Sequence, residues 1–378
     1  MKPIIKWPGW KLGEIDQIKP LIPAYKRYVE PFFGGGALFF HLQPPNAAIN
    51  DISESLITFY KMVQKQDEEF KNDVTVIING FSNMLAAIDS EASKLVSIFL
   101  VCQTSSTERR CTCREIEFLL DRQWKKIYTP ELKRVIPNKD AFYDTIKSYA
   151  SDKFARTIKN FQKKPFSEQD LRECLITGFT SGYYMYFRSV MNDLALGKLK
   201  NYSDAYATAV FFFVREYCYG SMFRYNAKGE FNIPYGGMSY NRKDMASKLE
   251  AIFSEEAQRI LQGADIHCKD FEEFLAVLQL SEDDFIFLDP PYDTDFSDYD
   301  GRSFTAEDQK RLAEFLKTTP AKFMLVIKKT DFVYDLYAED FNVLSFDKQY
   351  TYNICNRNDR EVKHLIITNY KPQKEQMK

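Results

Sequence analysis

Short apolar runs separated by amphipathic stretches occupy both ends of the chain. Each run is long enough for a buried strand, and the stretches between them repeat their apolar positions with a helical period. Because strands that alternate with helices form covered parallel sheets, the pattern predicts an α/β fold with a doubly wound, mostly parallel, Rossmann-like sheet. Residues 341–352 and 361–370 alternate apolar and polar positions and predict an antiparallel terminal hairpin. The predicted parallel strands are 28–32, 47–51, 264–268, 285–288 and 322–327.

Helical periods predominate in the middle of the chain. We therefore expect two domains: a sheet domain of residues 1–70 and 264–370, and a largely helical insertion and recognition domain of residues 71–263. An amphipathic stretch at residues 12–27 predicts one more helix near the start. The other predicted helical segments are 74–88, 92–102, 115–127, 140–160, 171–200 and 241–262.

A carboxylate follows one of the apolar runs directly. The run at residues 285–288 continues into Asp289-Pro290-Pro291-Tyr292. Two prolines cannot continue a strand ladder, so the strand ends there, at the edge where open α/β sheets bind ligands. The Asp289 carboxylate and the Pro290 carbonyl can each accept a hydrogen bond from one N–H group of an exocyclic amine, while Tyr292 stacks on the base. An ordinary strand end, with Asp289 as a helix cap and Tyr292 as packing, fits the same residues.

A glycine turn and a second acid accompany the first two predicted strands. Phe33-Gly34-Gly35-Gly36 lies between a strand and a helix, where backbone N–H groups can approach a nucleotide or its sulfonium analogue. Asp51 ends the second strand about 20 residues later, where ribose hydroxyls are bound. The glycines also suit a close helix–strand crossing, and Asp51 also suits an N-cap for a helix from Ser53.

A third strand end carries an acid followed by an aromatic ring. Asp270 and Phe271 follow residues 264–268 and can meet the adenine of a cofactor, although Asp270 also suits a helix cap. Strand ends of one sense share one edge of a parallel sheet. Asp51, Asp270, Asp289 and the glycine turn therefore predict a nucleoside pocket at that edge.

Charge and composition allow a nucleic-acid enzyme without requiring one. The 378 residues include 51 Lys and Arg and 53 Asp and Glu, a net charge of −2, and 15% are aromatic. Phosphate contacts act within about one Debye length, so a local basic face is sufficient for DNA. Residues 101–170 contain 15 Lys and Arg and 10 Asp and Glu, and they are locally basic.

Two short aromatic runs flank turn residues at 223–237, a pattern typical of a β-hairpin. The segment carries four side chains that can read base edges or hold phosphates, namely Arg224, Asn226, Lys228 and Asn232. An exposed structural hairpin without a ligand fits the same local pattern.

Cysteine usage and hydropathy exclude several protein classes. The seven cysteines are irregularly spaced in a long chain, which argues against a secreted disulfide scaffold. Cys111 and Cys113, with Cys102 nearby, could bind zinc, but no second pair or histidine follows at ligand spacing, and we expect no metal site. The basic N-terminus has no apolar signal-peptide region, and no uncharged apolar run reaches about 18 residues. We expect a cytoplasmic protein with no membrane contact.

Four blocks of the chain follow one another in a recognisable order. They are Lys6-Trp7-Pro8-Gly9-Trp10-Lys11, Glu30-Pro31-Phe32-Phe33-Gly34-Gly35-Gly36, residues 223–236 and Asp289-Pro290-Pro291-Tyr292. With these blocks the chain resembles the Dam-like adenine-N6 DNA methyltransferases over residues 1–62 and roughly 175–370. The resemblance implies a methyltransferase sheet with S-adenosyl-L-methionine as cofactor. It also implies transfer of the methyl group to the N6 amine of an adenine flipped out of duplex DNA.

The resemblance further implies roles for individual residues. Asp289, Pro290 and Tyr292 would hold the target base, and the 223–237 hairpin would belong to a target-recognition domain for double-stranded DNA. A cognate restriction endonuclease could be a further partner. The implied cofactor-binding residues are Trp7, Lys11, Phe32, Gly34, Gly36, Asp51, Ile52, Asp270, Phe271 and Asp289.

The chain departs from the family pattern in three places, and two other functions fit the same sheet. Trp10 stands where the family usually has glycine, residues 71–170 are surplus to the common length, and residues 327–330 are not the usual small polar ones. One alternative is a methyltransferase that acts on RNA or on a protein glutamine, but those enzymes more often carry Asn in place of Asp289. The other is a catalytically silent DNA-binding relative, which the intact Asp289 and Tyr292 argue against.

Overall fold

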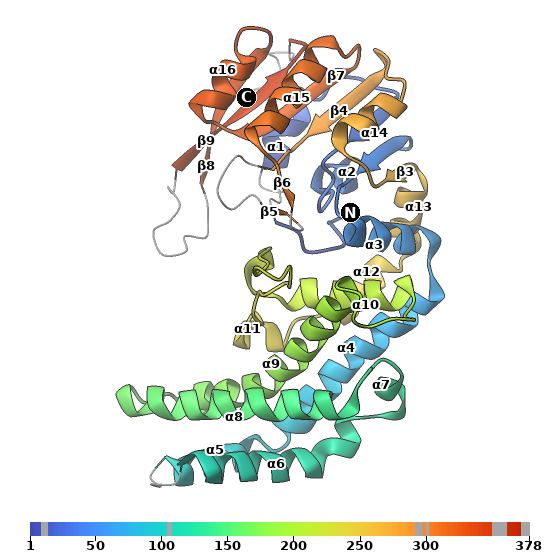
Figure 1. The fold of residues 1–378 in the computed structure, drawn as a ribbon. Helices are drawn as coiled ribbons and strands as arrows, with labels where there is room; N and C mark the ends of the chain where they lie inside the picture. Colours follow the sequence, from blue (N-terminus) through green and yellow to red (C-terminus); the bar gives the residue numbers. More distant parts are fainter. Residues whose placement is uncertain (9–13, 104–107, 292–297, 300–301, 350–360, 372–378) are drawn as a thin grey trace. The chain divides into compact units, whose positions relative to one another are not determined.

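The computed structural model describes residues 1–8, 14–103, 108–291, 298–299, 302–349 and 361–371 (Figure 1). The chain divides into two compact units, Met1–Lys65 with Ser254–Lys378, and Gln66–Phe253. The two domain boundaries predicted from the sequence, after residues 70 and 263, lie a few residues later in the chain. The roles given to the two parts of the chain stay predictions.

The first unit is built on a seven-stranded sheet with the order β3-β2-β1-β4-β7-β9-β8. The first five strands in this order pair in parallel, and β9 runs antiparallel to both β7 and β8. This arrangement confirms the predicted α/β sheet with its antiparallel terminal hairpin. The strands are β1 Arg27–Glu30, β2 Ala47–Asn50, β3 Ala264–His267, β4 Asp284–Leu288, β7 Lys322–Lys328, β8 Asn342–Gln349 and β9 Glu361–Thr368, with a separate short pair β5 Asp298–Tyr299 and β6 Arg302–Ser303.

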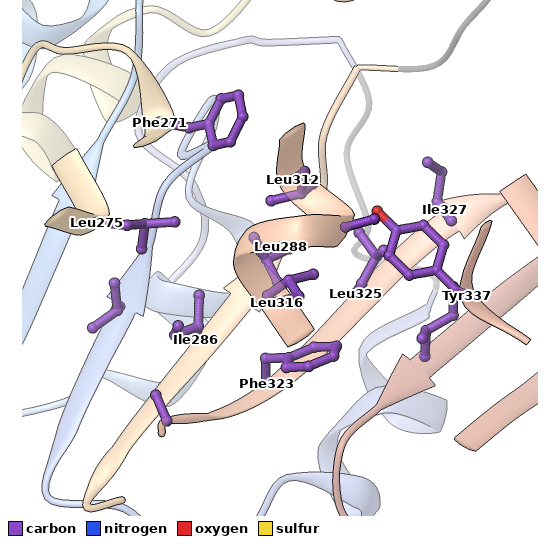
Figure 2. Close-up of a cluster of buried hydrophobic side chains, with 14 of the residues drawn as sticks. Phe271, Leu275, Ile286, Leu288, Leu312, Leu316, Phe323, Leu325, Ile327 and Tyr337 are labelled. Carbon is purple, nitrogen blue, oxygen red and sulfur yellow. The ribbon is translucent and has the colours of Figure 1, made fainter. Parts of the chain in front are cut away.

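Helices cover the sheet of the first unit (Figure 1). On one face, α14, α15 and α16 bury a continuous apolar core that includes Phe271, Leu316, Phe323 and Tyr337 (Figure 2). The helices of this unit are α1 Ile15–Ile18, η2 Lys19–Leu21, α2 Ala37–Leu42, α3 Glu54–Lys65, α13 Glu255–Gln262, α14 Phe271–Val277, α15 Ala306–Thr318 and α16 Asp331–Tyr337.

The strand β1 contributes to two different sets of packed side chains. Val29 belongs to the core under α14, α15 and α16, whereas the Tyr28 ring packs against Phe39 of α2 with centroids 6.3 Å apart. Successive side chains of a strand point to opposite faces, so this alternation is the two-residue period of β1. Both faces of β1 are buried, as expected for a central parallel strand.

The order in which successive strands are added to the sheet reverses between β1 and β4. The connection through α2 leads from β1 to β2 on one side, and the connection through α15 leads from β4 to β7 on the other. The two central strands pair in parallel, with Val29 opposite Ile286. Open α/β sheets bind ligands at such a switch point, beyond the carboxyl ends of the strands. Glu30 ends β1 at this edge, and Asp289 follows β4 directly.

The second unit is largely helical. α8 and α9 pack closely because two glycines of α9 face the backbone of α8: a Cβ on Gly178 would lie 2.9 Å from the Ala150 Cα, and one on Gly182 would lie 2.6 Å from the Ile146 Cα. In neither unit does a described helix have the length and apolar character that a bilayer span requires. The helices are α4 Glu68–Asp89, α5 Ala92–Cys102, α6 Glu108–Ile127, α7 Pro130–Arg134, α8 Lys139–Lys163, α9 Glu168–Ala195, α10 Asp204–Tyr217, η3 Tyr219–Ser221, α11 Met238–Asn241 and α12 Ala246–Ile252.

Two predicted helices are shorter than the sequence pattern indicates. Within the segment 12–27, which the structure describes from Glu14, helical structure ends at Leu21 because Ile22 precedes Pro23 and is extended, with φ −72° and ψ 127°. The segment 241–262 contains the end of α11, α12 and α13. Ser254 interrupts it because this residue is extended and its hydroxyl caps α13 by accepting a hydrogen bond from the Ala257 amide.

Candidate active site

Asp289 and Glu30 place two carboxyl groups at the ends of adjacent strands. Asp289 is half-buried directly beyond β4, and Pro290 next to it is buried. Glu30 is 3% exposed, and the Tyr28 hydroxyl donates a 2.8 Å hydrogen bond to its Oε2. Asp51 follows β2 and Asp289 follows β4, the two strands on either side of β1, so the three carboxyl groups stand at neighbouring strand ends at the switch point, and the charges of both aspartates act on Glu30. Glu30 had no predicted role of its own, although an acid inside an apolar strand is a signal for one.

Burial raises the pKa of the Glu30 carboxyl well above its ordinary value. The hydrogen bond from Tyr28 opposes this shift, and the charges of Asp289 and Asp51 add to it. Burial likewise raises the pKa of the Tyr60 hydroxyl, with further contributions from Asp51 and Glu30. The charges of Asp51 and Asp289, which contribute to these shifts, favour a cationic ligand group at this edge of the sheet.

The glycine turn and Asp51 are joined by a hydrogen bond. The Gly34 amide donates to Asp51 Oδ2 at 2.8 Å, and the Ser53 amide donates to Oδ1 at 3.0 Å just before α3. Gly34 and Gly36 have φ values of +49° and +63°, which glycine adopts without strain. A Cβ on Gly34 would lie 2.9 Å from Trp7 Cδ1, so the Trp7 side chain packs directly on the turn.

Asp270 begins α14 and is held by two partners. Its Oδ1 accepts a hydrogen bond from the Glu272 amide at 3.0 Å and another from Arg311 Nη2 at 2.8 Å. Arg311 also pairs with Glu272 and with Asp308, and its guanidinium carbon lies 4.9 Å from the Phe271 ring centroid. The helix cap is thus present at Asp270, and Arg311, which had no predicted role, fixes the orientation of this carboxylate.

Three aromatic rings lie together beside the end of β1. The Phe32 ring centroid is 5.5 Å from that of Phe271 and 5.4 Å from that of Phe304, and the last two are 5.8 Å apart. Phe32 is only partly buried, so the group presents an apolar face for a planar ring. The site thus combines aromatic rings, two strand-end acids and a glycine turn with no room for a side chain at Gly34. This combination fits an adenosine-containing cofactor.

Some predicted site residues lie outside the part of the chain that the structure describes. Lys11 and Tyr292 lie outside the described residues, as does Trp10. Ile52 is placed next to Asp51, and its carbonyl lies 3.9 Å from the Cys268 thiol as a weak acceptor. The described part of the chain contains no group of three or more His, Cys, Asp or Glu side chains arranged to hold a metal.

The predicted hairpin at residues 223–237 forms the turn but not continuous strands. It has two isolated antiparallel bridges, Tyr225 with Phe231 and Cys218 with Tyr235. Asn226 shapes the turn, because its Oδ1 accepts hydrogen bonds from the Lys228 amide at 2.9 Å and the Glu230 amide at 3.0 Å. The Lys228 side chain is exposed at the tip.

Arg224 and Asn232 lie opposite each other on the hairpin. Arg224 Nε donates a 2.6 Å hydrogen bond to Asn232 Oδ1, and Nη2 donates a 3.3 Å bond to the Asn232 carbonyl. These bonds hold the exposed guanidinium in one orientation. Of the four predicted DNA-binding side chains, Arg224 and Lys228 therefore present charge, while Asn226 and Asn232 support the geometry of the hairpin.

Helix α9 fixes the second half of the hairpin through side chains spaced four residues apart. Asn192 pairs with the Phe231 backbone in both directions, at 3.0 Å to its carbonyl and 2.8 Å from its amide. Arg188 and Tyr184 both donate to the Ile233 carbonyl, at 3.1 and 2.9 Å. Positions four apart share one face of a helix, so α9 serves as a rigid support for the hairpin. None of these three side chains had a predicted role.

Comparison with known proteins agrees with this geometry. A family model described as D12 class N6 adenine-specific DNA methyltransferase matches residues 7–174 and 140–352. The Type II methyltransferase M.CviBI of Paramecium bursaria Chlorella virus NC1A is 27% identical over 377 residues, which cover 98% of this chain and 100% of the relative. The Type II methyltransferase M.MjaIII of Methanocaldococcus jannaschii is 27% identical over 397 residues, covering 98% and 99%. A DNA adenine methylase of Vibrio cholerae is 22% identical over 320 residues, covering 83% and 76%.

A switch-point site of this kind in a mostly parallel sheet is the arrangement of a methyltransferase fold. The chain belongs to the D12 class N6 adenine-specific DNA methyltransferase family. It is therefore an adenine-specific DNA methyltransferase, which confirms the predicted function and enzyme class. The family match favours DNA over the RNA and protein-glutamine alternatives.

Proposed function

We propose that this enzyme transfers the methyl group of S-adenosyl-L-methionine to the N6 amine of an adenine that has left the duplex stack. The observation that carries the proposal is the position of Glu30, Asp51 and Asp289 at the ends of the neighbouring strands β1, β2 and β4, beside the glycine turn. When bound, S-adenosyl-L-methionine supplies an electrophilic methyl group on a sulfonium cation. The charges of Asp51 and Asp289 at this edge suit that cation.

The cofactor would be held along the ends of β1, β2 and β3. Asp51 would accept the ribose hydroxyls, and Asp270 would accept the adenine amine while Phe32 and Phe271 contact its ring. The left-handed turn of Gly34 and Gly36 would let the backbone approach the methionine part. The remaining proposed contacts are Trp7, Lys11, Ile52 and Asp289.

The target base would be held at the end of β4. The Asp289 carboxylate and the Pro290 carbonyl would each accept one N–H of the amine, and the Tyr292 ring would stack on the base. Two acceptors draw the amine nitrogen toward a tetrahedral geometry, in which its lone pair can attack the methyl carbon. Asp289 does not need to be a strong base, because attack precedes loss of the proton. Positioning therefore supplies most of the rate gain.

Double-stranded DNA would be bound by the second unit through the 223–237 hairpin. The exposed Arg224 and Lys228 would contact phosphates or base edges, and Asn226 and Asn232 would join them or hold the hairpin in shape. Unstacking one base costs a few kcal/mol, and the Tyr292 stack and the amine hydrogen bonds would offset it.

The purified chain provides a direct test. It would be incubated with methyl-tritiated S-adenosyl-L-methionine and unmethylated genomic DNA, and the digested nucleosides would be separated by liquid chromatography. We expect label in N6-methyl-2′-deoxyadenosine only. Label in cytosine, or labelling of RNA or protein in preference to duplex DNA, would contradict the proposal. A matched duplex with purine in place of adenine lacks the amine and should take up no label.

We further propose a cognate restriction endonuclease as a functional partner. Two of the relatives with full-length coverage are named Type II methyltransferases. Sequencing DNA from cells that express this chain would identify the methylated site. An extract of the source organism should then cleave that site in unmethylated DNA and leave the methylated form intact, and equal cleavage of both forms would count against the pairing.

A further inference from the structure

Asn50, the last residue of β2, connects three strand ends through one side chain. Its Nδ2 donates to the Pro31 carbonyl at 3.1 Å and to the Lys269 carbonyl at 3.0 Å, and its Oδ1 accepts from the Lys269 amide at 2.9 Å. The side chain is 1% exposed, so no solvent can replace these bonds. The Asn50 carbonyl also accepts a hydrogen bond from the Phe33 amide at 2.9 Å.

Each group that Asn50 holds adjoins a proposed cofactor contact. Pro31 precedes Phe32 and the glycine turn, Lys269 precedes Asp270, and Asn50 itself precedes Asp51. The amide therefore spans the segments that present the ribose acid, the adenine acid and the turn. A buried donor or acceptor without a partner is costly, so the backbone keeps the spacing at which all three side-chain bonds form.

We propose that Asn50 is a positioning residue for cofactor recognition, which sets the distance between the Asp51 and Asp270 ends of the site. This inference rests on the proposed function, because it concerns the same cofactor. Asn50 need not touch the cofactor. It acts through the backbone of Pro31 and Lys269, and the ends of β1, β2 and β3 shift relative to one another when its amide is removed.

The chain contains a matched control at the opposite end of β3, the strand that Lys269 follows. Gln64 of α3 also uses a side-chain amide to bind two backbone carbonyls, Leu261 at 2.7 Å and Ala264 at 2.9 Å. Ala264 begins β3, whereas Lys269 follows its end. Loss of either amide removes two side-chain hydrogen bonds to backbone carbonyls, but only Asn50 of the two lies at the edge with the proposed contacts.

The test compares the variants Asn50→Leu and Gln64→Met in the full chain. Binding of S-adenosyl-L-homocysteine would be measured by calorimetry, and thermal midpoints would be recorded alongside. We expect Asn50→Leu to weaken binding about tenfold or more, whereas Gln64→Met stays within about twofold of the wild type at a comparable loss of stability. Duplex DNA affinity without cofactor should be unchanged in both variants.

Asn50→Asp provides a second variant of the same shape in case Asn50→Leu does not fold. Its carboxylate still accepts from the Lys269 amide but cannot donate to either carbonyl. We expect weaker binding at pH 8 and a partial recovery, relative to the wild type, at pH 5.5, where protonation restores one donor. Unimpaired binding by the Asn50 variants, or an equal loss in Gln64→Met, would overturn the inference. Failure of the wild-type chain to bind either form of the cofactor would instead overturn the proposed function.

Discussion

Glu30 and Asp289 lie at the ends of the paired strands β1 and β4, and the charge of Asp289 adds to the burial that raises the pKa of the Glu30 carboxyl. Burial keeps Glu30 protonated at pH values where an exposed carboxyl would be ionised. A charge on Glu30 would be repelled by the charges of Asp289 and Asp51.

The raised pKa of Glu30 predicts a pH-dependent gain of stability for Glu30→Gln. The unfolded chain releases the Glu30 proton above its ordinary pKa of 4.5, and the folded chain releases it only at higher pH. The free energy of unfolding of the wild type therefore falls as pH rises through that window. We expect the advantage of Glu30→Gln to grow by about 1 kcal/mol or more between pH 4 and pH 8, measured by urea unfolding. The exposed Glu282→Gln should show no such trend, and a pH-independent difference for Glu30→Gln would contradict the assignment.

Asp289→Ala should abolish methyl transfer, while tritiated cofactor still binds through its other proposed contacts. The variant removes one of the two acceptors that orient the amine, and we expect the rate to fall by about a thousandfold or more. Single-turnover assays on duplex DNA and a filter-binding assay would separate the two effects. Asp283→Ala is the control, because Asp283 is an exposed acid that pairs with Lys26 at the other end of β4. A fully active Asp289→Ala enzyme would refute the catalytic role.

Tyr292→Ala should cost about 1–3 kcal/mol of base stacking. The loss belongs to the flipped base, so we expect it in the rate on duplex DNA and not in cofactor affinity. Tyr292→Phe keeps the ring and should stay close to the wild type. Fluorescence of 2-aminopurine at the target position would report the flipped state directly. Unchanged turnover of Tyr292→Ala on duplex DNA would count against stacking.

Asn192→Ala should loosen the hairpin and weaken DNA binding without affecting the cofactor. The variant leaves the Phe231 amide and carbonyl without their side-chain partner, which costs about 1–3 kcal/mol. DNA affinity would be measured by fluorescence anisotropy at several salt concentrations. Asn138→Ala removes the cap of α8, costs about 1 kcal/mol, and should leave DNA affinity intact. Equal DNA affinity of Asn192→Ala and the wild type would show that the hairpin does not depend on α9.

Asp284→Asn should destabilise the fold without changing the active site. Arg27 binds the buried Asp284 carboxylate with Nε at 2.8 Å and Nη2 at 2.9 Å, at the end of β4 opposite Asp289. Burial alone would raise the pKa of Asp284, but Arg27 and Ser281 lower it overall. The ionised Asp284 carboxylate therefore contributes to the free energy of unfolding above pH 3.8, the ordinary pKa of an aspartate. This contribution is lost as pH falls through the lower pKa of the folded state. We expect a loss of about 1–3 kcal/mol at pH 7 by urea unfolding, and a smaller difference at pH 2.5.

The sheet could be predicted from the sequence because its strands are short apolar runs that are recognisable locally. All five parallel strands and both antiparallel ones lie within a few residues of the predicted ranges. Helix ends were less accurate, since Pro23 and Ser254 interrupt segments whose apolar period continues past them. The hairpin at residues 223–237 forms the predicted turn, whereas its pairing is limited to two isolated bridges because α9 side chains bind its backbone in place of a second strand.

The sequence alone determined which residues are the candidates for the chemistry of this protein, because strand-end acids and glycine turns are short patterns that can be recognised within a few positions. Asp51, Asp270 and Asp289 are of this kind. Only the tertiary structure decided which groups act on them. The charge of Asp289 raises the pKa of Glu30, Arg311 orients the Asp270 carboxylate, and Asn50 binds the Lys269 backbone across 219 residues of sequence. Such contacts depend on the order in which strands enter the sheet, and no local period encodes that order.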